Sequence, residues 1–77
     1  MKNMKNVIEK NLNLGFTLVL YYGTLAVNDM MSCLFLFPSS PEKYTLNTLG
    51  ISYLYIDNSL EFIPYTHILK LRMIKKI

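Results

Sequence analysis

The side chains with the clearest capacity for chemistry are two tyrosines that lie two residues apart. Tyr53 and Tyr55 alternate with Leu54 and Ile56, so both project from the same face if this segment is a strand. Each ring can stack on a nucleobase, and tyrosine is also enriched where subunits meet. The pattern therefore predicts either a stacking platform for nucleotides or a subunit interface.

The single histidine follows a third tyrosine and precedes a basic C-terminal stretch. His67, two residues after Tyr65, is either a strand-end histidine bonded to a backbone carbonyl or a base-contacting, pH-sensitive group. The basic residues that follow would bind phosphates with salt-dependent affinity, or would simply keep an apolar domain in solution. They are Lys70, Arg72, Lys75 and Lys76.

Catalytic chemistry is poorly represented in this chain. It has one His and one Cys, no nucleophile elbow, and no phosphate-cradling loop among its three glycines. Cys33 lies in the apolar run MMSCLFLF, where we expect a buried and inert thiol. One Cys and one His cannot supply four zinc ligands. We therefore expect no enzyme activity, no cofactor and no metal site.

A short helix and about five strands are expected to position these residues. Residues 3–12 place Met4, Val7 and Ile8 at helical spacing, and Asn3 can cap the first turn. Apolar, β-branched and aromatic runs predict strands between residues 16 and 73. These runs are 16–22, then 25–27 or 30–37, then 44–49 as a third strand or an ordered loop, then 51–56, 60–63 and 67–73.

Proline and Asp-Asn mark the breaks between strands. The segment PSSPEK, residues 38–43, is a loop, and Pro64 interrupts the last pair of strands. Asp57 and Asn58 tolerate positive φ, which predicts a two-residue hairpin turn. So small a sheet must curl up or pair its edges. We expect one domain over residues 1–77, mainly β with a short N-terminal helix, folded as a five-stranded antiparallel barrel of the Sm-like or SH3-like kind.

The order of these parts resembles the Sm/LSm family, and most closely its bacterial Hfq branch of RNA chaperones. The stretch NVIEKNLNLGFTLVLYYG resembles the family's helix and first strand, with Gly23 at the strand end. Tyr65-Thr66-His67-Ile68-Leu69 resembles the Tyr-x-His segment of Hfq. The resemblance covers the two ends of the chain, and the middle departs from the family pattern. It implies a homo-oligomeric barrel that binds RNA.

The composition also points to self-association. The chain has 77 residues, of which 52% are hydrophobic and only 17% are charged, with a net charge of +3. That is more apolar surface than one small copy can conceal, and a single cysteine excludes a disulfide within the chain. We therefore expect the chain to bind copies of itself.

No membrane partner is expected, since Asn28-Asp29 divides two apolar runs that are each too short to span a bilayer. A membrane-associated peptide is the third interpretation. With no secretory signal evident, we expect a cytoplasmic protein, and the residue usage fits a low-GC bacterium or its phage.

The main functional hypothesis is a non-enzymatic homo-oligomeric barrel that binds RNA or a nucleotide. The alternative is a structural or inhibitory interaction module, phage-encoded, that docks on a host protein by edge pairing. A variant between the two sequesters a nucleotide signal between subunits.

Overall fold

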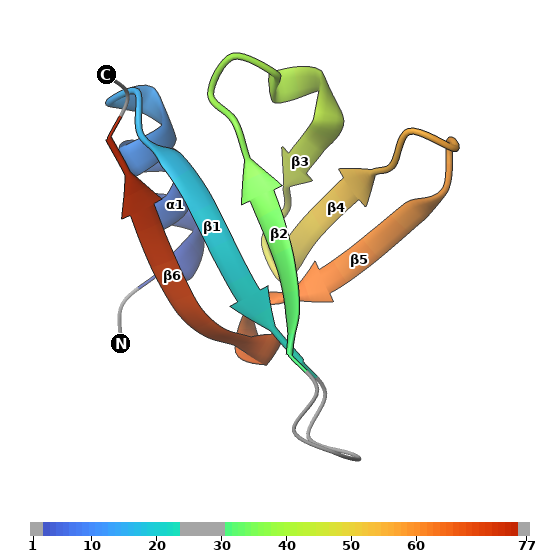
Figure 1. Ribbon diagram of the computed structural model, residues 1–77. Coiled ribbons are helices and arrows are strands. Elements are labelled where there is room, and N and C mark those ends of the chain that lie inside the picture. Colours follow the sequence, from blue (N-terminus) through green and yellow to red (C-terminus); the bar gives the residue numbers. More distant parts are fainter. Residues whose placement is uncertain (1–2, 24–30, 76–77) are drawn as a thin grey trace.

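Two three-stranded antiparallel sheets and one N-terminal helix make up the protein in a computed structural model, which describes residues 3–23 and 31–75. Sheet A has the strand order β2-β1-β6, and sheet B has the order β3-β4-β5 (Figure 1). The elements in chain order are α1 (Met4–Asn13), β1 (Thr17–Tyr22), β2 (Ser32–Leu36), η1 (Pro41–Lys43), β3 (Tyr44–Leu46), β4 (Gly50–Leu54), β5 (Leu60–Pro64), η2 (Tyr65–His67) and β6 (Ile68–Ile74).

The expected five-stranded barrel is wrong, because the described residues form six strands in two separate sheets. β2 ends at Leu36, and β3 begins only at Tyr44. Between them lie Pro38 and Pro41, which have no backbone N–H to donate to a ladder. The break predicted at residues 38–43 is confirmed, and it separates two sheets where a barrel would need a continuous ladder.

α1 has the N-cap that the sequence predicts. The Oδ1 atom of Asn3 accepts a hydrogen bond from the backbone N–H of Asn6 at 3.4 Å, which satisfies one free donor of the first turn. Gly15 follows the helix with φ of 93°, a left-handed conformation that favours glycine. Ile8 and Leu12, one turn apart, are buried, so the helix docks through this face.

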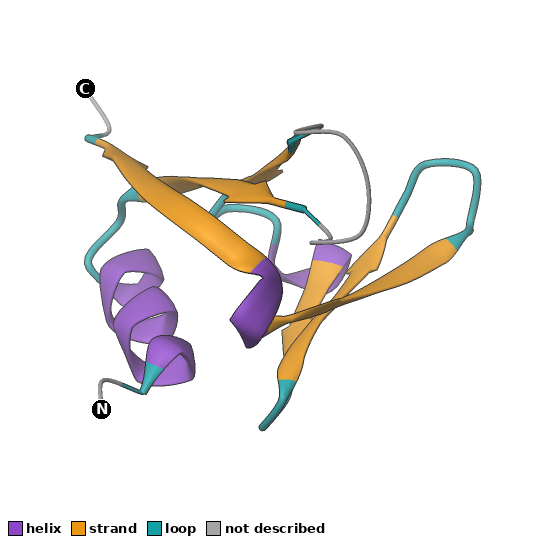
Figure 2. Cartoon of the chain, turned by 90° about the horizontal axis from the view of Figure 1, so that it is seen from below, coloured by secondary structure: helices purple, strands orange, loops and turns teal. Residues whose placement is uncertain are grey.

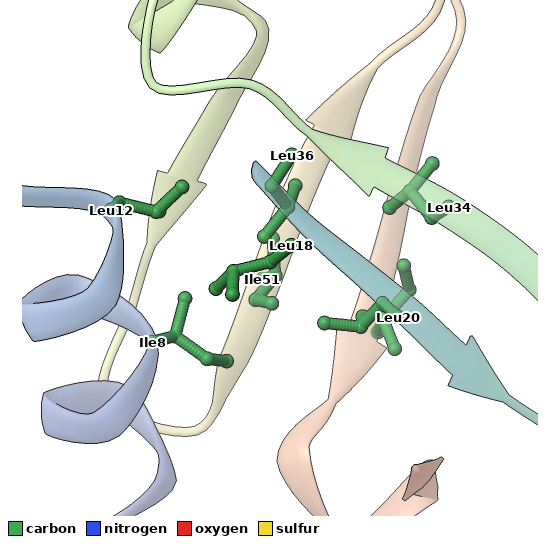
Figure 3. Packing of buried hydrophobic residues seen from close by; sticks show 8 residues of the cluster. Ile8, Leu12, Leu18, Leu20, Leu34, Leu36 and Ile51 are labelled. Carbon is green, nitrogen blue, oxygen red and sulfur yellow. The ribbon is translucent and has the colours of Figure 1, made fainter. Parts of the chain in front are cut away.

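The core lies between sheet A, sheet B and α1. Figure 3 shows Ile8 and Leu12 of the helix directed toward Leu18 of β1 and Ile51 of β4. Full burial of one such side chain contributes about 1.5–3 kcal/mol. In Figure 2, α1 and sheet B lie on the same side of sheet A. One face of sheet A is therefore committed to the core.

Tyr55 and Ser59 pair at the base of the turn between β4 and β5, so the turn has three residues, 56–58, and the predicted two-residue turn is wrong. The N–H of Tyr55 donates to the Ser59 carbonyl at 2.9 Å, and the N–H of Asn58 donates to the Tyr55 carbonyl at 2.9 Å. Asn58 has φ of 70°, so its predicted positive φ is confirmed. A left-handed residue after a turn is typical of three-residue hairpins.

The other segment predictions have mixed outcomes. The alternative strand at residues 25–27 lies outside the described residues. Pro64 is the last residue of β5, and the interruption predicted near it is the 3-10 helix η2. No helix in residues 3–23 and 31–75 has both the length and the apolar character to cross a bilayer.

Candidate functional site

The candidate site is the face of sheet A that points away from α1 and sheet B. Figure 2 shows no described helix or strand covering it. Val19 of β1 pairs with Phe35 of β2 on one side and with Arg72 of β6 on the other, so these residues share a face. Tyr21 pairs in the same way with two neighbours, Cys33 and Lys70. We call this surface the aromatic–basic face; its members are Val19, Tyr21, Cys33, Phe35, Phe37, Lys70 and Arg72.

Two phenylalanine rings stack in parallel at the β2 edge of this face. Phe35 and Phe37 are 44% and 46% exposed. Their ring centroids lie 5.9 Å apart, and the ring planes differ by only 16°. Parallel, exposed rings can stack on nucleobases of any sequence, because every base has a π face.

Two basic side chains of β6 lie on the same face, next to Tyr21. The Nζ atom of Lys70 lies 5.8 Å from the centroid of the Tyr21 ring, within cation–π distance. The Nη1 atom of Arg72 donates a hydrogen bond to the Tyr21 hydroxyl at 3.4 Å. β1, β2 and β6 contain no acidic residue, so the charge that the sheet contributes to this face is positive.

Val19 is a buried member of the aromatic–basic face. It is only 2% exposed, although it lies outside the main core cluster. Its cross-strand neighbours Phe35 and Arg72 flank it on the same face. A buried β-branched side chain between them can pack against both neighbours across the strands.

The expectation that Cys33 is buried is wrong, because the residue is exposed. Side chains alternate along β2, and Leu34 and Leu36 occupy the core side. Cys33 and Phe35 therefore project from the opposite face of sheet A. The mistake came from treating the whole run MMSCLFLF as core.

Tyr53 and Tyr55 are not on the aromatic–basic face. Both pack against the core cluster from sheet B, with their rings edge to face at a centroid distance of 5.0 Å. The hydroxyl of Tyr55 donates to the Glu61 carboxylate, and the hydroxyl of Tyr22 donates to the same oxygen at 3.1 Å. We call Tyr22, Tyr55 and Glu61 the tyrosine cluster. It joins β1 to the β4–β5 hairpin, and the hydroxyls of Tyr22 and Tyr55 are both bonded to Glu61.

The pKa values of the two tyrosines in this cluster are raised above the usual value of 10.0. Burial is the main cause of the raised pKa of Tyr22, and the Glu61 carboxylate adds to it. Burial is also the main cause of the raised pKa of Tyr55, and its hydrogen bonds to Glu61 and Tyr22 raise that pKa further. In both residues the neutral phenol is the favoured form, which suits a donor to a carboxylate.

The remaining predicted site residues are dispersed. The hydroxyl of Tyr65 donates to the carbonyl of Asn47 at 2.6 Å, which ties η2 to the loop before β4. His67 ends η2 half-buried, and its backbone carbonyl accepts from the N–H of Gly23 at 3.1 Å. Lys75 is exposed beyond β6, and Lys76 lies outside the described residues. Of the predicted residues that the structure describes, only Lys70 and Arg72 therefore lie on the aromatic–basic face.

Sequence reasoning missed the aromatic half of the site. Phe35 and Phe37 alternate with Leu34 and Leu36, a pattern that puts aromatic rings on one face and aliphatic side chains on the other. This alternation was a usable signal. The pairing that brings β6 beside β1, and so adds the two cations, could not be read from local sequence.

Metal binding has no support in the described part of the chain, where no three His, Cys, Asp or Glu side chains cluster. No protein-family model, no curated protein and no solved structure matches the chain. The functional argument therefore depends on the geometry of the site.

Proposed function

We propose that the chain is a non-enzymatic, self-associating protein that binds single-stranded RNA on the aromatic–basic face. The observation that carries the proposal is the combination on one uncovered surface of parallel exposed rings and two cations. Bases stack on Phe35 and Phe37, and the backbone phosphates approach Lys70 and Arg72. Aromatic platforms flanked by basic side chains are a general solution for single-strand binding.

The test is a titration of fluorescently labelled oligo-U and oligo-A, followed by anisotropy at several salt concentrations. Two phosphate contacts on a single strand predict a plot of log affinity against log salt with a slope near −1.4, about 0.7 per contact. Binding of both oligonucleotides supports stacking without a strict sequence requirement. Failure of both to bind at low salt contradicts the proposal.

We propose that self-association uses sheet B. Leu60 and Phe62 are 74% and 51% exposed, and both lie on β5, an edge strand of the sheet. An edge strand with apolar side chains is a ready template for pairing with another chain. Full burial of one such side chain contributes about 1.5–3 kcal/mol, so a second copy gains from covering this surface. Light scattering coupled to size-exclusion chromatography measures the assembly.

A second candidate function uses the same apolar surface for a different partner. The exposed β5 edge also fits an interaction or inhibitory module that adds its strand to a host protein. This alternative predicts a wild-type chain that is monomeric and binds no oligonucleotide. It also predicts capture of one defined host protein that a Leu60→Glu variant does not capture.

A further inference from the structure

A pocket of about 290 Å³ opens beside the aromatic–basic face, where β2 approaches sheet B. Its lining residues are Phe35, Phe37, Ser40, Lys43, Tyr44 and Tyr53. Phe35 and Phe37 belong to both surfaces, so a ligand stacked on the face lies at the edge of the pocket. The volume is near the lower limit of about 300–1,000 Å³ for small-ligand sites, which fits one small molecule.

The walls of the pocket are aromatic and fixed in place. The hydroxyl of Tyr44 donates to the carbonyl of Phe37 at 3.1 Å, which links sheet B to the end of β2. Tyr53 pairs with Tyr44 across the β3–β4 ladder, and its ring is packed against Tyr55. The hydrogen bonds between described residues leave the Tyr53 hydroxyl without a partner, so it can bond to a ligand.

Among the described residues that line the pocket, the one charged side chain is that of Lys43, at the end of η1. A lysine in a lining that is otherwise mostly aromatic favours a ligand that is both planar and anionic. A neutral apolar ligand would gain nothing from this charge, and a folded protein segment would not fit the volume. The chemistry points to a flat ring system that carries a phosphate.

We propose that the pocket binds one nucleotide unit, a nucleobase with its monophosphate. The base packs against the rings of Phe37 and Tyr53, and the Lys43 ammonium pairs with the phosphate. The Tyr53 hydroxyl bonds to an edge of the base. This inference rests on the proposed function, since the unit is either a nucleotide of the RNA strand or a free nucleoside monophosphate.

Calorimetric titration with free UMP and AMP tests the pocket directly, with inorganic phosphate as a probe of charge alone. We expect Lys43→Gln to weaken nucleotide binding about tenfold or more, the effect of losing one charge-assisted hydrogen bond. Tyr53→Phe keeps the ring and removes only the hydroxyl, so we expect about a fivefold loss. Lys10→Gln, an exposed lysine on α1, is the matched control and leaves binding unchanged.

Three results overturn the pocket: no binding of UMP or AMP, Lys43→Gln binding within twofold of wild type, or phosphate binding as tightly as the nucleotides. Thermal melts of Lys43→Gln and Tyr53→Phe check that both variants fold, and Lys43 is a half-buried surface position that tolerates the change.

A parallel titration with oligo-U shows whether the nucleotide comes from RNA or is free. It also tests the pocket and the proposed function separately. If the unit comes from RNA, Lys43→Gln weakens oligo-U binding as well; if it is a free nucleotide, only UMP or AMP binding falls. Oligo-U binding without any nucleotide binding overturns the pocket alone. Nucleotide binding without oligo-U binding overturns the proposed function and leaves the pocket standing.

Discussion

The outer faces of the two sheets differ in chemistry, although both sheets have three antiparallel strands. The outer face of sheet A has two parallel phenylalanine rings and two cations, and its strands carry no acid. The strands of sheet B contain no Lys, Arg or His, and the edge strand β5 exposes Leu60 and Phe62. The core lies between the two sheets, and each outer face has the chemistry of the partner proposed for it: RNA for sheet A and a second copy of the chain for sheet B.

Charge reversal on sheet A should have the largest effect. We expect the double variant Lys70→Glu/Arg72→Glu to weaken oligo-U binding by more than about 100-fold, since two charge-assisted contacts are lost. The double variant Lys5→Glu/Lys10→Glu makes the same charge change on α1 and serves as the control. Fluorescence anisotropy at one fixed salt concentration measures both. Equal losses in the two variants would mean that binding follows net charge and not the aromatic–basic face.

A charge placed on sheet B should disrupt assembly and leave RNA binding in place. In a Leu60→Glu variant, an interface would have to bury a carboxylate, so we expect the dissociation constant of the oligomer to rise about 100-fold. Leu14→Glu makes the same change at an exposed position after α1. Sedimentation equilibrium measures the assembly state of both. If Leu60→Glu assembles like the wild type, the β5 surface is not the interface.

The same substitution on each sheet gives the sharpest comparison. Phe35→Leu removes one stacking ring from sheet A, and we expect oligo-U affinity to fall about tenfold, within the range of about 1–3 kcal/mol for one stacked base. Phe62→Leu removes a ring of similar exposure from sheet B. We expect it to change oligo-U affinity by less than about twofold. Similar effects in both variants would remove the distinction between the faces.

The smallest predicted effect concerns the tyrosine cluster that joins the sheets. Because the pKa values of Tyr22 and Tyr55 are raised in the folded protein, their contribution to stability is fully present below pH 10 and is lost as the pH rises above it. Tyr22→Phe removes one hydrogen bond to Glu61, so we expect the free energy of unfolding at neutral pH to fall by about 1 kcal/mol. The decline above pH 10 should be shallower in this variant.

Urea titrations of Tyr22→Phe between pH 7 and pH 11 measure both quantities. Tyr44 and Tyr65 also have raised pKa values, mainly through burial, so a part of the alkaline decline remains. A variant as stable as the wild type at pH 7, with an identical decline, would show that the cluster does not join the sheets in solution.

Local features of the fold were predictable from the sequence. Asn3 and the spacing of Met4, Val7 and Ile8 predict the helix, because capping and helical periodicity depend on neighbours along the chain. The first strand and the break at residues 38–43 were predictable for the same reason. The resemblance to the Sm/LSm family stays a prediction.

Non-local features were not predictable. The two-sheet arrangement depends on which strands pair across long separations, and local propensity does not encode such pairing. The expectation of a site at Tyr53 and Tyr55 was reasonable for a strand face. It did not anticipate that Glu61, on the neighbouring strand, would bind the Tyr55 hydroxyl. Both rings pack against the core, and Tyr53 also lines the pocket beside β2.

The central claim is that the outer face of sheet A binds single-stranded RNA. Backbone amide chemical shifts of the isotope-labelled wild-type protein, recorded during titration with oligo-U, test it residue by residue. We predict that the amides of β1, β2 and β6 shift in a saturable manner while those of β5 do not. Shifts concentrated on β5, or no saturable shift at low salt, would contradict the claim.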